Sequence, residues 1–270
     1  METKRSYRPW MAASLKAGVA FACLVALSAQ SAQTTSPAQP APAASEDSVA
    51  SPAPAVSPSS RVGRYGTADG KQQFILDRSG EDAKVQFEGS SEVLVLKSQP
   101  APMGERWLKL DTGDVLLRVT TWGGLTLFTP DNRHGIPVDR MGDAPPLSLP
   151  VYTLEDLHAH AVTIEAQIGM QLGRFTPLSV DWAALPDTAE ARATLHDALD
   201  NVGAAIQRFV AEAVEPEDVI DGLRSVAILV GPRPGVAMDG GRFVVVIAPE
   251  EGLEGRFSSA ALAAYLKSEL

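Results

Sequence analysis

The chain has 270 residues, 45% of them hydrophobic, and a formal net charge of −10, which is typical of a globular protein rather than a disordered or fibrous one. Residues 1–32 hold four basic residues and one acidic residue, so the remainder has 19 basic and 32 acidic residues and a net charge of −13. Such a chain repels phosphate backbones and anionic lipid, which argues against nucleic-acid binding and against attachment to an anionic membrane.

The first 32 residues have the pattern of an export signal. Four basic residues, the last of them Lys16, lead into an apolar run over residues 17–29. The run has 13 residues, which is shorter than the roughly 20 that a membrane-spanning helix needs. It fits the roughly 7–15 residues of a secretory signal peptide. We therefore expect cleavage between about Ala29 and Gln33, a mature protein in the periplasm and no stable membrane insertion after processing.

The only cysteine, Cys23, lies inside this apolar run. A lipoprotein signal would need a small residue at the position of Phe21, two residues before the cysteine. We therefore expect Cys23 to leave with the signal peptide. The mature chain then has no disulfide, no thiolate metal site and no cysteine nucleophile. Its stability must come from its hydrophobic core.

Residues 33–61 are predicted to be a disordered linker. Between positions 33 and 60 there are six prolines, seven alanines and seven serines, and almost nothing that could be buried. Such a segment cannot offset the entropy that it would lose on ordering. Its proline content favours an extended spacer that holds the folded part away from a membrane. A tolerated tail without such a function is the simpler interpretation and is preferred.

Residues 62–129 are predicted to be a β-rich subdomain. Short apolar runs with period-two alternation are separated by turn residues, which indicates an antiparallel meander, either an open sheet or a small barrel. The predicted strands are 74–76, 85–87, 92–96, 106–110, 115–119 and 125–128. Residues 130–150 follow with five prolines and little periodicity, and we expect them to form a connecting loop.

Residues 151–270 are predicted to be a mixed α/β subdomain with three helices and a β-hairpin, so the whole chain is expected to be an α+β protein. Thr153 and Gly173 are suited to the two ends of a helix over 154–172. The other predicted elements are a strand at 177–182, a helix starting at Asp187 or Thr188, strands at 225–230 and 243–248, and a last helix capped by Ser258.

Asp111 begins the sequence Asp-Thr-Gly, which resembles one half-site of an aspartic protease. That chemistry needs two carboxylates sharing one proton. The chain contains one copy of the motif, and Asp114 stands where such a protease has a small residue. A turn between two strands, with a positive φ at Gly113, explains the motif better.

His158 and His160 lie on the predicted helix 154–172, close to acidic residues. Glu155 and His158 have the spacing of half a di-iron motif, but the sequence has no second such motif. Residues two apart on a helix also point to different faces, so His158 and His160 are not expected to share an ion. Surface pairs of Glu155 with His158 and of Asp156 with His160 are the simpler interpretation.

Other polar motifs also have structural explanations. His196 precedes Asp200 by one helical turn on the polar side of its predicted helix, and His134 falls in the connecting loop. Residues 231–235 could suggest an anion-binding loop, but their prolines lack the amide hydrogens that would bind phosphate. A plain turn is expected there.

Residues 255–259 precede the last predicted helix and include the cation Arg256. Free N–H groups in the first helical turn, together with this guanidinium, could bind an anion. A helix start that Ser258 caps, with Phe257 and Leu262 forming a hydrophobic staple, is the simpler account. No residue is therefore assigned as catalytic, cofactor-binding or metal-binding, and no cofactor is expected.

Several segments together resemble an uncharacterised family of exported alphaproteobacterial proteins, domain-of-unknown-function family 4908. The segments that carry the resemblance are 74–80, 87–93, 117–129 and 255–260. The resemblance covers most of residues 64–270, and the family favours proline where this chain has Phe257. It implies export, a Gram-negative envelope and one unit spanning both halves. It implies no activity, cofactor or catalytic residue.

These observations favour a non-enzymatic periplasmic protein that binds an envelope protein or a cell-wall component, using free edges of the antiparallel sheet. The alternatives are a periplasmic hydrolase with a site between the two halves, centred on Asp111, and a structural envelope spacer. If Asp111, or the helix that carries His158 and His160, lines a cleft shared by the two halves, the hydrolase is favoured over the binding protein.

Overall fold

The computed structural model describes residues 61–212 and 222–270. The predicted signal peptide and, apart from Arg61, the predicted linker lie outside these residues. In the part of the chain that is described, no helix has both the length and the apolar character needed to cross a membrane.

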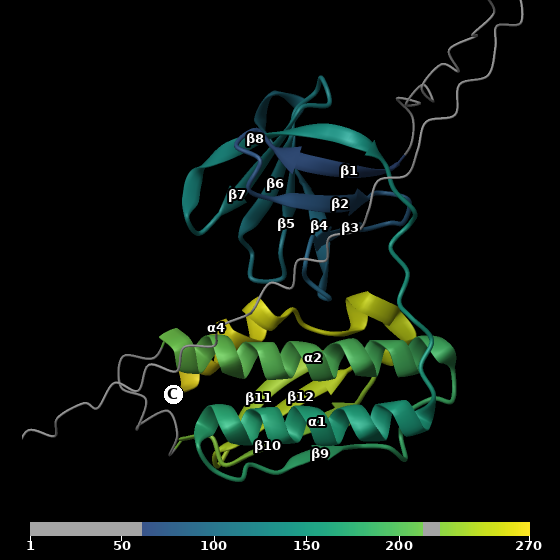
Figure 1. Cartoon of the computed structure of the whole chain (residues 1–270), viewed down its shortest axis with the longest axis vertical. Coiled ribbons are helices and arrows are strands. Elements are labelled where there is room, and N and C mark those ends of the chain that lie inside the picture. The colour runs from purple at the N-terminus through teal and green to yellow at the C-terminus, as the bar shows by residue number, and fades with distance from the viewer. Residues whose placement is uncertain (1–60, 213–221) are drawn as a thin grey trace, which may run out of the picture. The chain divides into compact units, whose positions relative to one another are not determined.

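The first part is a closed barrel of eight antiparallel strands (Figure 1). Each strand pairs with the next one along the chain, and the last pairs with the first. The strands are β1 (Val62–Thr67), β2 (Gln73–Asp77), β3 (Ala83–Phe87), β4 (Val93–Pro100), β5 (Arg106–Lys109), β6 (Val115–Val119), β7 (Leu125–Thr129) and β8 (Asn132–Asp143). The short 3₁₀ turn η1 (Pro102–Gly104) joins β4 to β5. The expected antiparallel β region is confirmed, and it closes into a barrel.

The barrel core follows from the period-two alternation of its strands. Phe74 and Leu76 on β2, Leu117 on β6 and Leu127 on β7 point inward and are at most 1% exposed. Alternate residues of the same strands face outward, because successive side chains of a strand lie on opposite faces. Burying each such side chain stabilises the fold by roughly 1.5–3 kcal/mol.

The expectation of a structureless loop over residues 130–150 is wrong, because most of this segment is strand β8. The first half of β8 pairs with β7 and the second half with β1, so β8 closes the barrel. The prolines were misleading: Pro137 lacks an N–H, but its carbonyl still accepts a hydrogen bond from the Ala68 amide at 3.1 Å. Closure also leaves no free edge in this sheet, contrary to expectation.

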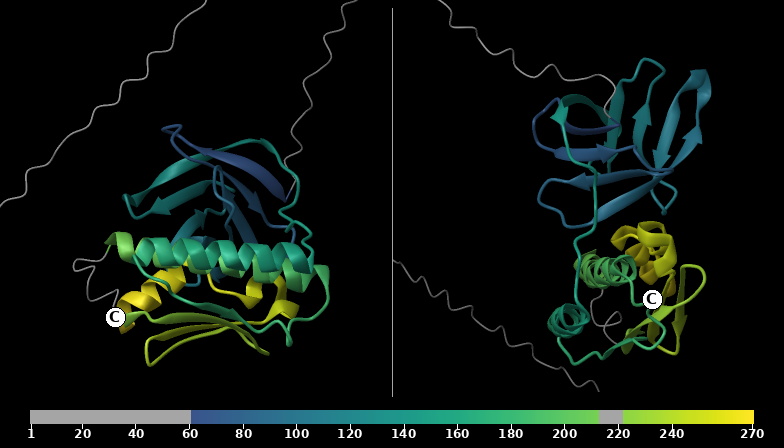
Figure 2. Two further views of the ribbon diagram at one scale, coloured as in Figure 1. Left: turned by 60° about the horizontal axis from the view of Figure 1, so that its bottom comes forward. Right: turned by 90° about the vertical axis from the view of Figure 1, so that its right-hand side faces the viewer.

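The second part combines helices with a four-stranded sheet whose order is β11-β12-β10-β9. Its elements are α1 (Leu154–Leu172), β9 (Leu178–Val180), α2 (Ala189–Glu212), β10 (Ser225–Val230), β11 (Gly235–Asp239), β12 (Arg242–Ile247), the 3₁₀ segment η2 (Pro249–Gly255) and α4 (Ser259–Glu269). The helices lie on one face of the sheet (Figure 2). An α+β architecture is therefore present as expected.

The strand pairing of this sheet differs from the expected hairpin. The predicted strands 225–230 and 243–248 correspond to β10 and β12, but these two strands run parallel. The segment between them contains β11, which forms the actual hairpin with β12. Strand β9 is also parallel to β10, with α2 as the connection between them. Parallel neighbours need such a connection because a short turn cannot reverse the chain twice.

The helix ends agree with the sequence signals. Thr153 and Asp156 form a capping box at the start of α1, and Gly173 ends this helix with φ +66°. Thr188 accepts the Ala191 amide at the start of α2, at 3.1 Å. Ser258 accepts the Ala261 amide at the start of α4, also at 3.1 Å. Each contact satisfies an N–H that has no partner inside its helix.

The helical part has its own hydrophobic core, which shares no residue with the barrel core. Leu157 on α1, Leu199 on α2 and Phe243 on β12 are fully buried in it. Side chains also cover both edges of the sheet: the Tyr265 hydroxyl accepts the Met238 amide at 3.0 Å, and Glu165 accepts the Leu178 amide at 2.9 Å. Each contact occupies one edge amide that an added strand would otherwise pair with.

Candidate functional site

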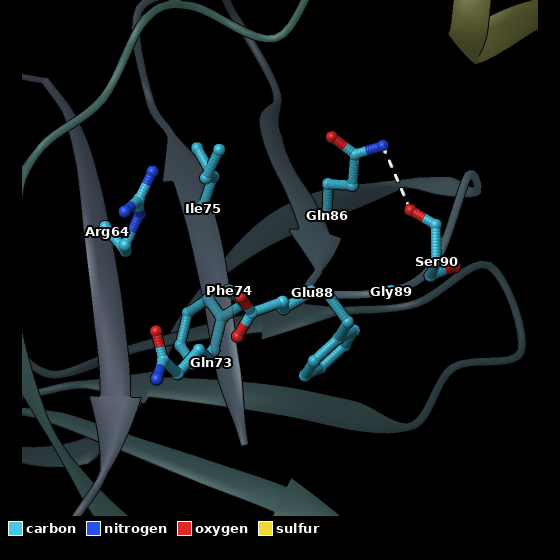
Figure 3. A pocket seen from close by; sticks show the side chains of 9 residues that line it. Arg64, Gln73, Phe74, Ile75, Gln86, Glu88, Gly89 and Ser90 are labelled. Atoms are coloured by element: carbon cyan, nitrogen blue, oxygen red, sulfur yellow. Dashed lines mark hydrogen bonds between the residues drawn. The ribbon is translucent and has the colours of Figure 1, made fainter. Parts of the chain in front are cut away.

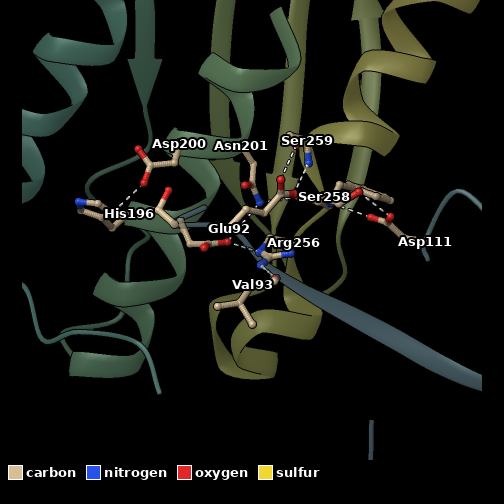
Figure 4. A network of polar contacts seen from close by, with 12 residues as sticks. Glu92, Val93, Asp111, His196, Asp200, Asn201, Arg256, Ser258 and Ser259 are labelled. Carbon is tan, nitrogen blue, oxygen red and sulfur yellow. Dashed lines mark hydrogen bonds and ion pairs between the residues drawn. The ribbon is translucent and has the colours of Figure 1, made fainter. Parts of the chain in front are cut away.

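The start of helix α4 binds two carboxylates from the barrel (Figure 4). Ser258 donates its amide and its hydroxyl to Asp111, each at 2.6 Å. Ser259 does the same toward Glu92, at 2.8 and 2.6 Å. The positive end of a helix and its free amides favour negative charge. The expected cap by Ser258 is present, and the alternative interpretation of residues 255–259, an anion at the helix start, also holds in that two carboxylates of the same chain bind there.

Arg256 forms a buried ion pair with Asp197 of α2 in the same network. Its side chain is 2% exposed, and it also donates to the backbone carbonyl of Val93 on β4. Burial raises the pKa of Asp197 to about 6, with Arg256 opposing the shift. Asn201 donates to Asp197 at 3.2 Å and to the carbonyl of Phe257 at 3.0 Å. This network joins the barrel to α2 and α4 by polar contacts.

Asp111 therefore lies in a turn and also contacts the start of helix α4. Gly113 has φ +90° as expected, and its amide closes the turn on the carbonyl of Leu110 at 2.9 Å. Both carboxylate oxygens of Asp111 accept hydrogen bonds from Ser258. An aspartic protease site would instead hold a second carboxylate against Asp111. Asparagine would not fully replace Asp111 here, because an amide group has only one acceptor oxygen.

The barrel and the helical part also line a common hollow of about 250 Å³. Its charged lining residues are Lys84 and Glu190, and most of the remainder is apolar or backbone. Asp111, His158 and His160 are not among its lining residues. This hollow therefore gives no support to a hydrolase centred on Asp111 or on the histidine helix.

The histidines form contacts that helix spacing did not predict. His160 reaches Asp200 of α2, with 2.8 Å between Nε2 and Oδ1, rather than pairing with Asp156. His158 lies against the ring of Trp182 at 3.8 Å, rather than pairing with Glu155. These partners come from distant parts of the sequence, so local spacing carries no signal for them.

The expected relation of His196 to Asp200 is confirmed, with 3.5 Å between Nδ1 and Oδ2. Burial and the neighbouring His160 ring lower the pKa of His196, while Asp200 and Asp156 oppose the shift. His134, expected in a loop, lies instead on strand β8 and is exposed. Residues 231–235 form a turn followed by β11, as their prolines indicated.

A groove on the outer wall of the barrel is the strongest candidate for ligand binding (Figure 3). It has a volume of about 260 Å³. Arg64, Ile75 and Gln86 face it from neighbouring strands, where they stand opposite one another in the strand register. A second hollow of about 310 Å³ shares Gln73 and two further lining residues with the groove, so the two hollows adjoin.

The polar side chains of the groove are available for a ligand. Among the described residues, Arg64, Gln73 and Glu88 make no side-chain hydrogen bond or ion pair. Gln86 donates to the backbone carbonyl of Ser90 at 3.1 Å, which fixes its amide at the rim of the groove. No local sequence pattern indicates this groove, because its residues are ordinary outward positions of strands that only closure of the barrel brings together.

Fold and site together define a closed eight-stranded barrel with a polar groove, joined by hydrogen bonds to a mixed α/β part. The chain belongs to the family described as domain of unknown function (DUF4908), whose model matches residues 44–266. The family that the sequence resembles is thereby confirmed, whereas export and an alphaproteobacterial source stay predictions. No curated protein and no solved structure matches the chain.

Proposed function

We propose that this protein is an exported, non-enzymatic binding protein of a Gram-negative cell envelope, and that the barrel groove holds its ligand. The proposal of export depends on the basic and apolar pattern of residues 1–32. The proposal of binding depends on the groove, where three polar side chains lack partners within the described residues.

The lining of the groove favours a polar, uncharged ligand with some apolar surface. Arg64 supplies donors, Glu88 supplies acceptors and Gln73 supplies both. Ile75 and Phe87 add half-buried apolar surface beside these groups. Sugar rings present hydroxyl groups around their edge and C–H groups on their faces, which matches this mixture. A cell-wall glycan is therefore the ligand class that we propose.

A binding role accounts for the polar features better than the two alternatives. The hydrolase alternative was centred on Asp111, whose carboxylate is used to hold Ser258. A structural spacer would not need a groove with unpaired polar groups. Neither alternative has a specific observation in its favour.

The proposal is tested by measuring binding of the purified protein to isolated cell-wall sacculi and to soluble glycan fragments. Replacing Arg64 or Gln73 with alanine is expected to weaken binding at least about tenfold, since each removes hydrogen bonds worth roughly 1–3 kcal/mol. Arg78→Ala is the matched control, because Arg78 is exposed on the barrel and outside the groove. Equal binding by all variants, or none by the wild type, would contradict the proposal.

Export is tested separately by fractionation and N-terminal sequencing. We expect a periplasmic mature chain that begins between about Ala29 and Gln33. An intact Met1 in the membrane fraction would contradict this part of the proposal.

A further inference from the structure

The side chains of His160, His196 and Asp200 converge between helices α1 and α2. One ligand atom from each lies within 4.8 Å of the other two. Asp200 contacts both imidazoles, at 2.8 Å to His160 and 3.5 Å to His196. The two rings are stacked in parallel, with centroids 3.9 Å apart, and Tyr152 stacks on the other face of His196 at 3.8 Å.

The donor set has the chemistry of a transition-metal site. Two imidazole nitrogens and one carboxylate oxygen are ligands that Zn²⁺ and similar first-row ions accept, whereas Ca²⁺ and Mg²⁺ prefer oxygen alone. The side chains are 17–31% exposed, so an ion can enter and water can complete its coordination.

We propose that His160, His196 and Asp200 bind one divalent transition-metal ion, of which Zn²⁺ is representative. An ion bound to imidazole lies close to the plane of the ring, and two parallel stacked rings do not share such a point. At least one ring must therefore turn out of the stack when the ion binds. The χ2 torsion of histidine is broad, so this rotation needs no change in the helices.

The site is independent of the barrel groove and of the proposed ligand. Without metal, the same residues form a hydrogen-bonded stack that holds α1 against α2, and this contact alone could account for their positions. Direct measurement of metal binding separates the two explanations, because a purely structural stack has no affinity for the ion.

The test is a titration of the metal-free full chain with Zn²⁺ at neutral pH, followed by calorimetry. We expect one ion per chain for the wild type, and binding weakened at least about tenfold by His160→Ala and by Asp200→Asn. His158→Ala is the matched control, because His158 is on the same helix but contacts Trp182 instead. It is expected to bind like the wild type.

The NMR signals of the histidine rings provide a second measurement, which uses the wild type and does not depend on whether a variant folds. In NMR spectra of the wild type, Zn²⁺ is expected to shift the imidazole signals of His160 and His196 and to leave those of His134 unchanged. Absence of binding by the wild type, or unaltered binding in both site variants, would overturn the proposal. Equal shifts at all histidines would do the same, since they would indicate non-specific association.

Discussion

The barrel and the α/β part differ in how far along the chain each strand finds its partner. In the barrel, every strand pairs with its neighbour in sequence, and only the contact of β8 with β1 is distant. In the α/β part, β9 and β10 are separated by the whole of α2, and β10 pairs with β12 across β11. Local patterns therefore predict the barrel well and the second sheet poorly.

The contacts between the two parts differ in chemistry from the packing inside either core. Each core is apolar and self-contained, whereas the contacts that join the two parts are polar: Arg256 donates to the Val93 carbonyl, Ser258 to Asp111 and Ser259 to Glu92. Buried polar contacts are weak evidence for net stability, but removing one partner is costly because the other is left buried and unpaired. Variants of this network should thus reveal whether the two parts unfold together.

The largest effect is expected for Arg256→Ala. The substitution leaves the carboxylate of Asp197 buried beside Glu92 and Asp200, and we expect the free energy of unfolding to fall by about 3–5 kcal/mol. Denaturant unfolding, followed by tryptophan fluorescence and circular dichroism, measures it. The double variant Arg256→Met with Asp197→Leu removes both charges and should recover much of the loss. A loss below about 1 kcal/mol for Arg256→Ala would show that the pair is not buried in solution.

The two cores are compared by Leu127→Ala in the barrel and Leu199→Ala on α2. Both side chains are fully buried, so each variant is expected to lose about 2–5 kcal/mol. If the polar network couples the parts, both variants lower the midpoint of one shared denaturant transition. Two separate transitions, with each variant affecting only one, would show that the parts unfold independently.

A smaller effect is expected for Asp111→Asn, with Asp114→Asn as the matched control in the same turn. Asp111 accepts two hydrogen bonds from Ser258, and an amide can accept only one of them well, so a loss of about 1–3 kcal/mol is expected. Both residues are exposed, but Asp114 bonds only within the turn, where its carboxylate accepts from Thr112 at 2.9 Å. Its variant should change stability by less than about 0.5 kcal/mol. Equal effects would mean that only the turn matters.

A still smaller effect, the controls aside, is expected for Asp77→Asn, which tests how the segment after β8 is attached to the barrel through the Leu147 amide. Burial raises the pKa of Asp77, but hydrogen bonds from Ser79 and from the Leu147 amide outweigh it, so the pKa lies below its ordinary value of 3.8. Ionised Asp77 therefore stabilises the fold above that value, and the contribution is lost as the pH falls through the lower folded pKa.

We expect Asp77→Asn to cost about 1–2 kcal/mol at pH 7 and less in strong acid. Denaturant titrations of both proteins between pH 2 and pH 7 measure the difference. A gap between wild type and variant that stays constant over this range would contradict the downward shift in the pKa of Asp77.

The sequence by itself determined most strands of the barrel, the helix ends and the turn at Gly113. These features depend on period-two alternation, on capping residues such as Thr153 and Ser258, and on the positive φ that glycine permits. All of them act over a few residues. The family resemblance was also correct, because it depends on short segments read in order.

Only the tertiary structure decided the parallel pairing of β10 with β12, the role of β8 and the partners of the charged residues. Asp111 and Ser258 are 147 residues apart, and His160 and Asp200 are 40 apart. The groove likewise combines outward positions of adjacent strands after the barrel closes. Such contacts form when the whole chain folds, and no local preference of the residues involved encodes them.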